Sequence, residues 1–469
     1  MIQPGWEALE STIAGVVILP GSPAYGLAYR ALNARFDDVR PQAVVRCANA
    51  DDVAAAIRFA RRQRMAVATR GGGHCFGGRS STDGILIDVT PIHAVEIFSA
   101  SVTVGGGARL GEVYERLLQR DRVIPAGSCP SVGIAGLALG GGFGIIGRKH
   151  GLTSDHLLGA QVVLADGRVV ACDEHHEADL FWALRGGGSG NFGVVTALTF
   201  RTVRPPEVIN FQLSWPFAEA AAVIEAWQAW SPSAPEELAA SLLVKSGADV
   251  DEPPSVDVFG VMLGGQSDAA ELIGEMTSRT PSDPSAMVSE PMSYLDTTHY
   301  WGERAAREPV AGEPAGQELR GCRFIRSEFF RRPLPPEAIE SVLENFRTKR
   351  VAGETRELDF SPWGGAYNRL PADATAFVHR SEQYMLKHAS EVAPGATDSE
   401  KEAAHAWASR SWEAVHPWGA DRVFPNFPDP DLKAWARAYY GENLERLQEV
   451  KAHYDPENVF RFHQSLSAP

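Results

Sequence analysis

One stretch of the chain, residues 127–144, constrains its fold more than any other. Seven of its eighteen residues are glycine, and most of the positions between them hold small apolar side chains. A loop that faces solvent would be polar, so this stretch is expected to be buried. Glycine has no Cβ atom, so other groups can approach its backbone closely. The pattern predicts a segment packed against something flat, and a planar cofactor ring fits that description.

Two further glycine clusters lie in the same part of the chain, over Arg70–Gly78 and Leu184–Val195. A single glycine triplet is typical of a tight turn. Consecutive glycines also let backbone N–H groups converge on an anion such as a pyrophosphate. No Gly-Lys-Ser/Thr follows any cluster, which excludes a P-loop, and the flanking elements do not match a Rossmann unit. Three such cradles together predict a large, extended cofactor.

Bulk composition is that of a soluble globular protein, with 44% hydrophobic residues. The net charge of −15 is dispersed and argues against nucleic acid as the main partner. The N-terminus lacks a secretory pattern and no apolar run approaches a membrane span, so we expect no membrane association and a cytoplasmic location. The five cysteines are far apart in the sequence and predict neither a disulfide framework nor a metal site.

The chain divides into three predicted regions, namely residues 1–205, 206–415 and 416–469. Residues 205–207, Pro-Pro-Glu, are the expected linker between the first two. Predicted strands of the first region cover 66–69, 85–89, 101–104, 161–164, 168–170 and 194–200, and predicted helices cover 53–60 and 110–118. In the second region we predict helices over 218–230 and 335–346 and strands over 256–262 and 356–360. Both regions therefore read as α+β.

Two reactive side chains are embedded in glycine clusters, namely His74 in Arg70–Gly78, the first cluster along the chain, and Cys129 in residues 127–144, the second. A histidine at a turn is usually a hydrogen-bonding or surface residue, and a lone cysteine in apolar surroundings is usually inert core. Their occurrence together, each inside a predicted cofactor cradle, favours a role in holding the cofactor.

At this point the sequence resembles the berberine bridge enzyme-like branch of the FAD-linked oxidases, flavoproteins of the vanillyl-alcohol oxidase type. The segments that carry the resemblance are Arg70–His74, Gly127–Gly144, His150–Asp155 with Val163–Gly167, Asp179–Val195, Tyr439–Gly441 and Tyr454–Phe460. It spans nearly the whole chain, although the middle region matches only loosely.

The resemblance implies a two-domain α+β fold. In it, an FAD-binding domain of two α+β subdomains (1–205, with 416–469 returning to it) accompanies a substrate domain (206–415) whose antiparallel sheet is covered by helices. It implies FAD bonded through its 8α-methyl to His74 and through C6 to Cys129. Val132 matches a position associated with oxygen access, which favours an oxidase. The residues assigned to the cofactor are Arg70, Gly71, Gly72, Gly73, His74, Gly77, Cys129, Val132, Gly133, Gly136, Gly140, Gly142, Gly144, Asp155, Gly193, Val195 and Asn458.

One departure from the family pattern concerns the catalytic base. Many members carry Tyr-x-Asn-Tyr-x-Asp near the C-terminus, whereas this chain has Phe424 and Phe427 in place of the two tyrosines. Phenylalanine cannot take a proton, so the base must come from elsewhere. Glu357 and Asp359 share one face of a predicted strand and are the first candidates. Further candidates are Tyr367, His299 and Tyr384.

The function expected from these features is oxidation of a bulky aromatic, polyketide-like or glycosylated intermediate. Hydride would pass to flavin N5, with molecular oxygen as acceptor and hydrogen peroxide as product. A substrate as acidic as a phenol, enol or hemiacetal would need no strong base. One alternative is an oxidative cyclase or desaturase that forms a new ring or C–C bond, and a more distant one is a flavin-binding protein without catalysis. The expected partners are a small-molecule substrate and oxygen, with the chain acting as a monomer or homodimer.

Overall fold

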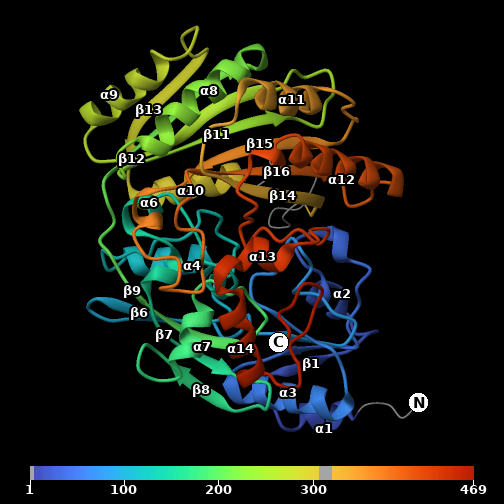
Figure 1. Cartoon of the computed structure of the whole chain (residues 1–469). Coiled ribbons are helices and arrows are strands. Elements are labelled where there is room, and N and C mark those ends of the chain that lie inside the picture. The colour runs from blue at the N-terminus through green and yellow to red at the C-terminus, as the bar shows by residue number, and fades with distance from the viewer. Residues whose placement is uncertain (1–4, 306–319, 469) are drawn as a thin grey trace.

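The computed structural model describes residues 5–305 and 320–468, with the side chains of 303–305 left aside. Figure 1 shows two layers, one built on two smaller sheets that hold the N-terminal half of the chain and one built on a large sheet above them. Helices and antiparallel sheets occur in both. The α+β class expected from the sequence is confirmed.

The first sheet has the strand order β1-β2-β4-β3, with bounds Val16–Ile18, Ala43–Arg46, Ile85–Asp88 and Val67–Arg70. β2 and β3 both run parallel to β4, and β1 is antiparallel to β2. Helix α3 (Ala50–Gln63) begins at Asn49, whose side chain accepts a hydrogen bond from the Asp52 N–H. Helix α1 (Trp6–Glu10) packs beside α3, and α2 (Tyr25–Tyr29) packs beside β2.

The second sheet is antiparallel, with the order β5-β6-β9-β7-β8. Its strands are Val95–Ile97, Ser101–Gly105, Val194–Arg201, Leu157–Val163 and Val169–Cys172. The predicted hairpin is the β7–β8 turn, where Gly167 has a φ of 83°. The sheet shares a core with α4 (Leu110–Leu118), α5 (Ile134–Leu139) and α7 (Ala178–Leu184). The short helix α6 (Gly147–His150) follows α5.

The third sheet has seven antiparallel strands in the order β13-β10-β12-β11-β15-β16-β14. Their bounds are Ala286–Met292, Val208–Pro216, Ser255–Leu263, Leu238–Ser246, Thr355–Pro362, Tyr384–Val392 and Cys322–Phe330. One face packs against α8 (Ala220–Trp230), α9 (Gln266–Thr277), α11 (Pro336–Arg347) and α12 (Asp398–Glu413). The opposite face turns toward the first two sheets.

One helix contacts both layers. Helix α10 (Tyr294–Ala305) lies below the large sheet in Figure 1 and contacts both β10 and α4. The C-terminal helices α13 (Trp435–Tyr440) and α14 (Leu444–Tyr454) share the core of the second sheet and α7. The chain thus leaves the lower layer near residue 206 and returns after α12. The boundaries at 205 and 415 stay a prediction.

Candidate flavin site and the sheet face above it

The first two glycine clusters meet backbone to backbone. A Cβ atom built on Gly72 would lie 2.2 Å from the Gly133 nitrogen, and one built on Gly133 would lie 2.4 Å from the Gly72 nitrogen. No side chain larger than hydrogen fits at either position without moving a loop. The loop after β3 and the turn before α5 are therefore locked together, and they carry His74 and Cys129.

His74 and Cys129 converge on one hydroxyl. His74 Nε2 lies 3.0 Å from Ser131 Oγ, and Cys129 Sγ lies 3.5 Å from the same oxygen. All three side chains are half-buried. The sequence predicted the histidine and the cysteine as a pair, and the structure brings them together. Ser131 was not singled out, because a serine beside a Cys-Pro turn carries no signal of its own.

The segment beside this pair faces open space. Gly136 lies on α5, is exposed, and has no atom within 4 Å of the position where a Cβ would be. Val132, Leu137 and Phe143 in the same stretch are only half-buried although apolar. A planar aromatic cofactor would cover these groups, so the residues present fit a flavin ring.

Other predicted cofactor residues shape the loops. Arg70, at the end of β3, donates hydrogen bonds to the carbonyl oxygens of Ala28, Tyr29, Arg30 and Ser80. These bonds use all five of its N–H donors, and they close the loop of residues 71–80. Burial lowers the pKa of Arg70 to about 10. Arg70 therefore stabilises the loop that carries His74.

Asp155 accepts two hydrogen bonds from the Arg380 guanidinium, at 2.9 and 2.6 Å. Asn458 has a left-handed backbone, and its buried Oδ1 has no hydrogen-bond partner among the described residues. An orphaned buried acceptor of this kind is rare in proteins and is compatible with an absent partner. The Asp155 carboxylate is thus already paired with Arg380, whereas Asn458 Oδ1 is available to accept a hydrogen bond from a ligand.

The third glycine cluster plays a different part from the first two. The N–H groups of Gly186 and Gly188 both donate to the Leu139 carbonyl at the end of α5. Gly193 and Val195 are buried, and Gly193 packs against β7. The Gly186 and Gly188 N–H groups therefore link this cluster to the end of α5, next to the second cluster. A role of the third cluster in holding the cofactor stays a prediction.

The remaining predicted glycines pack against neighbours from distant parts of the chain. Gly77 approaches Pro428, Gly140 approaches Asn426, and Gly142 approaches Thr153. Gly144 hydrogen-bonds to Tyr367 through its backbone, Gly71 approaches Gly106, and Gly73 has a φ of 73°. Through Gly77 and Gly140, the C-terminal Phe-Pro-Asn-Phe-Pro-Asp motif contacts both the first and the second glycine cluster.

The large sheet presents a charged cluster toward the lower layer. Its members are Arg323 (β14), Glu357 and Asp359 (β15) and Lys387 (β16). Arg323 Nη2 lies 2.6 Å from Glu357 Oε2, and Lys387 Nζ lies 2.7 Å from Asp359 Oδ2 and 3.9 Å from Glu357. Along β15 the alternating residues Leu358 and Phe360 are fully buried on the helix-covered face, which puts both carboxylates on the other face.

Aromatic side chains from the lower layer touch this charged cluster. The Arg323 guanidinium lies 6.0 Å from the ring centre of Phe76, two residues after His74, and the Lys387 ammonium lies 5.6 Å from that of Phe427. The two rings are 5.9 Å apart. Burial alone would lower the pKa of Arg323, but the carboxylates of Glu357 and Glu391 outweigh it and raise that pKa. The charged cluster and the loop that carries His74, here called the tether loop, thus border a common region.

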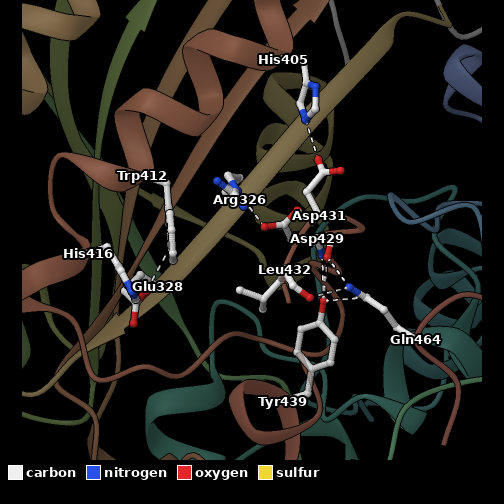
Figure 2. A network of polar contacts seen from close by, with 10 residues as sticks. All are labelled: Arg326, Glu328, His405, Trp412, His416, Asp429, Asp431, Leu432, Tyr439 and Gln464. Atoms are coloured by element: carbon white, nitrogen blue, oxygen red, sulfur yellow. Dashed lines mark hydrogen bonds and ion pairs between the residues drawn. The ribbon is translucent and has the colours of Figure 1, made fainter. Parts of the chain in front are cut away.

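The motif that holds Phe427 is anchored firmly, as Figure 2 shows. Asp429 closes the motif, and its Oδ2 lies 2.6 Å from Arg326 Nε on β14. The Asp429 N–H donates to Tyr439, and its carbonyl accepts from Gln464. Asn426 donates to the Leu137 carbonyl on α5. The two phenylalanines therefore occupy fixed positions between the cradles and the sheet.

The other candidate bases lie elsewhere. Tyr367 is buried, stacks on Trp363, and hydrogen-bonds through its hydroxyl to the Gly144 backbone. Tyr384 lies on the helix-covered face and donates to the Arg332 carbonyl. Burial raises the pKa of both phenols, which makes them poor bases. His299 is exposed on α10. The charged cluster is where the structure brings candidate bases together.

The comparisons with known proteins agree with this geometry. Residues 41–173 match the model of the FAD binding domain, and residues 423–467 match the berberine and berberine like model. An uncharacterized FAD-linked oxidoreductase, YvdP of Bacillus subtilis (strain 168), is 32% identical over 97% of this chain and 99% of its own.

Two solved structures are similar along the whole chain. Physcomitrella patens BBE-like 1 has a TM-score of 0.88 at 26% identity, over 99% of each chain. The Acremonium strictum glucooligosaccharide oxidase, whose structure is described as containing 6-S-cysteinyl, 8α-N1-histidyl FAD, has a TM-score of 0.87 at 26% identity, over 99% of each chain. This chain belongs to the berberine bridge enzyme-like family of FAD-linked oxidoreductases.

Two further observations concern the described residues. Across residues 5–305 and 320–468, no helix is long and apolar enough to cross a membrane. The same part of the chain groups no three His, Cys, Asp or Glu side chains in a way that could hold a metal ion.

Proposed function

We propose that this protein is an oxidase that carries its FAD on two covalent bonds, one to His74 and one to Cys129. The observation that carries the proposal is the convergence of both side chains on Ser131 Oγ, at 3.0 and 3.5 Å. Bonds to the 8α-methyl group and to C6 both require side chains close to the same outer ring of the flavin, and the shared contact with one hydroxyl supports this arrangement. The glucooligosaccharide oxidase, with its 6-S-cysteinyl, 8α-N1-histidyl FAD, supports the same reading.

When bound, FAD supplies a two-electron acceptor that takes hydride from the substrate and is reoxidised by molecular oxygen, which gives hydrogen peroxide. The chain's part is to hold the substrate over the ring and to take the hydroxyl proton. Asp359 is the base we favour, because Lys387 links it to Phe427 and so to the tether loop. Glu357 is held by Arg323 and would orient the substrate.

The lining of the site indicates the class of substrate. One side carries the half-buried rings of Phe76 and Phe427, and the other carries the charged cluster on β14, β15 and β16. An aromatic face would pack on the rings, and hydroxyl groups would hydrogen-bond to the charges. We therefore propose a bulky substrate that has both, such as a glycosylated aromatic or polyketide-like compound. Val132, half-buried next to the cradle, is where we expect oxygen to approach the ring.

The proposal is tested by denaturing the purified protein in acid and running it on a denaturing gel. Covalent flavin stays with the polypeptide and fluoresces in the band. Peptide mass spectrometry then locates it, and we expect flavin on both the His74 and the Cys129 peptide. The variants His74→Ala and Cys129→Ala should each keep a single bond. Flavin that leaves the wild-type chain completely would overturn the double attachment, and absence of peroxide on turnover in air would overturn the oxidase.

A second candidate function is oxidative ring closure or desaturation. The absence of a phenol at positions 424 and 427 favours it, since such reactions need no base at that place. Product analysis separates the two functions. All three reactions remove two hydrogen atoms, but oxidation of an alcohol gives a carbonyl group, ring closure gives a new ring, and desaturation gives a new C=C bond.

A further inference from the structure

Ser131 lies directly between the two proposed attachment residues. Its hydroxyl oxygen is 3.0 Å from His74 Nε2 and 3.5 Å from Cys129 Sγ. A serine hydroxyl has one donor and two acceptor positions. It can therefore accept a hydrogen bond from the imidazole N–H and donate one to the sulfur at the same time. Such a bridge connects the two side chains through one hydroxyl group.

The backbone around Ser131 is fixed from two directions. The Leu110 N–H donates to the Val132 carbonyl at 2.9 Å, and the Gly111 N–H donates to the Pro130 carbonyl at 3.0 Å. On the other side, Gly72 and Gly133 touch through their backbones, and a Cβ on Gly72 would also lie 3.0 Å from the Ser131 carbonyl. The fold thus sets the position of the hydroxyl before any cofactor binds.

We propose that Ser131 is a positioning residue for covalent flavin attachment, which holds His74 and Cys129 at the spacing and in the protonation state that bonding requires. The inference rests on the proposed function. A histidine tautomer is set by the hydrogen bond that one ring nitrogen makes. With the proton on Nε2, donated to Ser131, the lone pair is on Nδ1, which becomes the nitrogen that bonds.

The attachment chemistry balances with oxygen as the oxidant. At His74, a C–H bond of the ring methyl group and an N–H bond of the imidazole are replaced by one C–N bond. At Cys129, a ring C–H bond and the S–H bond are replaced by one C–S bond. Each step releases two electrons and two protons, which convert one O₂ to H₂O₂. Ser131 Oγ lies within hydrogen-bonding distance of the Nε2 proton that His74 gives up.

The alternative is that Ser131 only stabilises the turn. Its hydroxyl would then affect the stability of the protein but not the order or rate of the two attachments. A pair of variants of nearly equal shape separates these readings. Ser131→Thr keeps a hydroxyl, whereas Ser131→Val replaces it with a methyl group. Ser131→Ala is the simple deletion, and Ser128→Ala is a control in the same loop, since no side-chain hydrogen bond of Ser128 is seen in the described residues.

The experiment follows attachment itself. Each chain is produced under flavin limitation and then incubated with FAD in air. Covalent flavin on the His74 and Cys129 peptides is measured over time by mass spectrometry, and thermal unfolding checks that each variant is folded. We expect Ser131→Ala and Ser131→Val to attach flavin about tenfold more slowly, with Ser131→Thr and Ser128→Ala within about twofold of wild type.

The outcomes separate this inference from the function on which it rests. If wild type carries flavin on neither peptide, the proposed double attachment fails. If wild type carries both bonds and Ser131→Ala forms them at the same rate, the role of Ser131 alone is refuted. Should Ser131→Ala fail to fold, the Thr and Val pair decides. Equal rates in that pair refute the role of the hydroxyl, and a slow Val variant beside a fast Thr variant supports it.

Discussion

The tether loops and the charged face of the large sheet meet at one site but are built in opposite ways. The loops are held by backbone contacts between glycines, as at Gly72 and Gly133. The sheet face is held by side-chain charges from three strands, in which Arg323 and Lys387 each contact a carboxylate of β15. The first arrangement tolerates no added atom, whereas the second can change residue by residue. The cofactor half of the site is therefore rigid, and the substrate half is where specificity can vary.

The largest effect is expected from Gly72→Ala. Its Cβ would lie 2.2 Å from the Gly133 nitrogen, so the two loops must separate, and we expect a loss of about 3 kcal/mol of unfolding free energy or more. Gly136→Ala is the matched control, because open space lies before it. It should leave stability unchanged or raise it by up to about 1 kcal/mol, since alanine favours the helix. Urea unfolding measures both, and in-gel fluorescence should show less covalent flavin in Gly136→Ala. Equal stability of the two variants would contradict the locked loops.

The next effect tests the sheet face. Asp359→Asn should slow reduction of the bound flavin by about 10²- to 10⁴-fold, the usual contribution of a general base. Glu357→Gln should slow it much less and raise KM, because the proposal gives Glu357, beside Arg323, a role in orienting the substrate. Stopped-flow absorbance under anaerobic conditions gives both constants. A larger loss in Glu357→Gln than in Asp359→Asn would exchange the two roles.

A smaller effect is expected from restoring a phenol. Phe427→Tyr places a hydroxyl beside Lys387, whose ammonium lies 5.6 Å from that ring, and we expect kcat/KM for alcohols to rise by up to about tenfold. Its pH profile should gain a second titrating group. Phe424→Tyr is the contrast, because Phe424 is buried among aromatic side chains. A phenol without a partner there should cost about 1–3 kcal/mol of stability. An unchanged pH profile in Phe427→Tyr would place the chemistry elsewhere.

The smallest effect concerns the anchor of the C-terminal segment shown in Figure 2. His416 Nδ1 lies 2.9 Å from the buried Glu328 carboxylate, which also accepts from Trp412 and from the Arg422 N–H. The hydrogen bond to Glu328 raises the pKa of His416 above its ordinary 6.5, with Asp421 adding to the rise and burial and Arg326 opposing it. Burial raises the pKa of Glu328 in spite of His416.

The raised pKa values of His416 and Glu328 both make the folded protein less stable as pH rises. A raised folded pKa favours the protonated form, so the contribution of His416 is present in full below pH 6.5 and is lost as pH rises through its folded pKa. Because His416 is more than one third exposed, we expect no more than about 1 kcal/mol. Guanidinium unfolding at about pH 6 and about pH 9 should show wild type above His416→Gln only at the lower value. A difference that grows with pH would reverse the assignment.

The glycine loops and the large sheet also differ in how far the sequence predicted them. Helix α4, the β7–β8 hairpin and strands β3, β4, β6 and β9 were predicted, because each is signalled by consecutive residues, whereas β1, β2 and β5 were not. In the large sheet the sequence predicted only the strands that became β12 and β15. Strand β14 is buried along almost its whole length but holds Arg323, Arg326 and Glu328, so neither an apolar run nor a regular alternation marks it in the sequence. No local pattern shows that Arg323 and Lys387 flank Glu357, since that depends on the strand order β15-β16-β14.

The third glycine cluster shows what a local pattern leaves open. Gly186 and Gly188 form a nest like that of the other clusters, but their N–H groups donate to the Leu139 carbonyl. Whether a nest binds a ligand or another part of the chain depends on what the fold places in front of it. Likewise, Arg70 directly precedes the His74 loop, yet its guanidinium is used by carbonyl groups beneath that loop.

By itself the sequence determined that the chain binds a large flat cofactor, that His74 and Cys129 are its attachment candidates, and that phenols are missing at positions 424 and 427. These properties belong to short contiguous segments, where backbone freedom and residue type are enough. Only the tertiary structure placed Ser131 between His74 and Cys129. It also placed Lys387 between Asp359 and Phe427. Those positions depend on contacts between loops and strands that are far apart in the chain, and packing, not local preference, decides them.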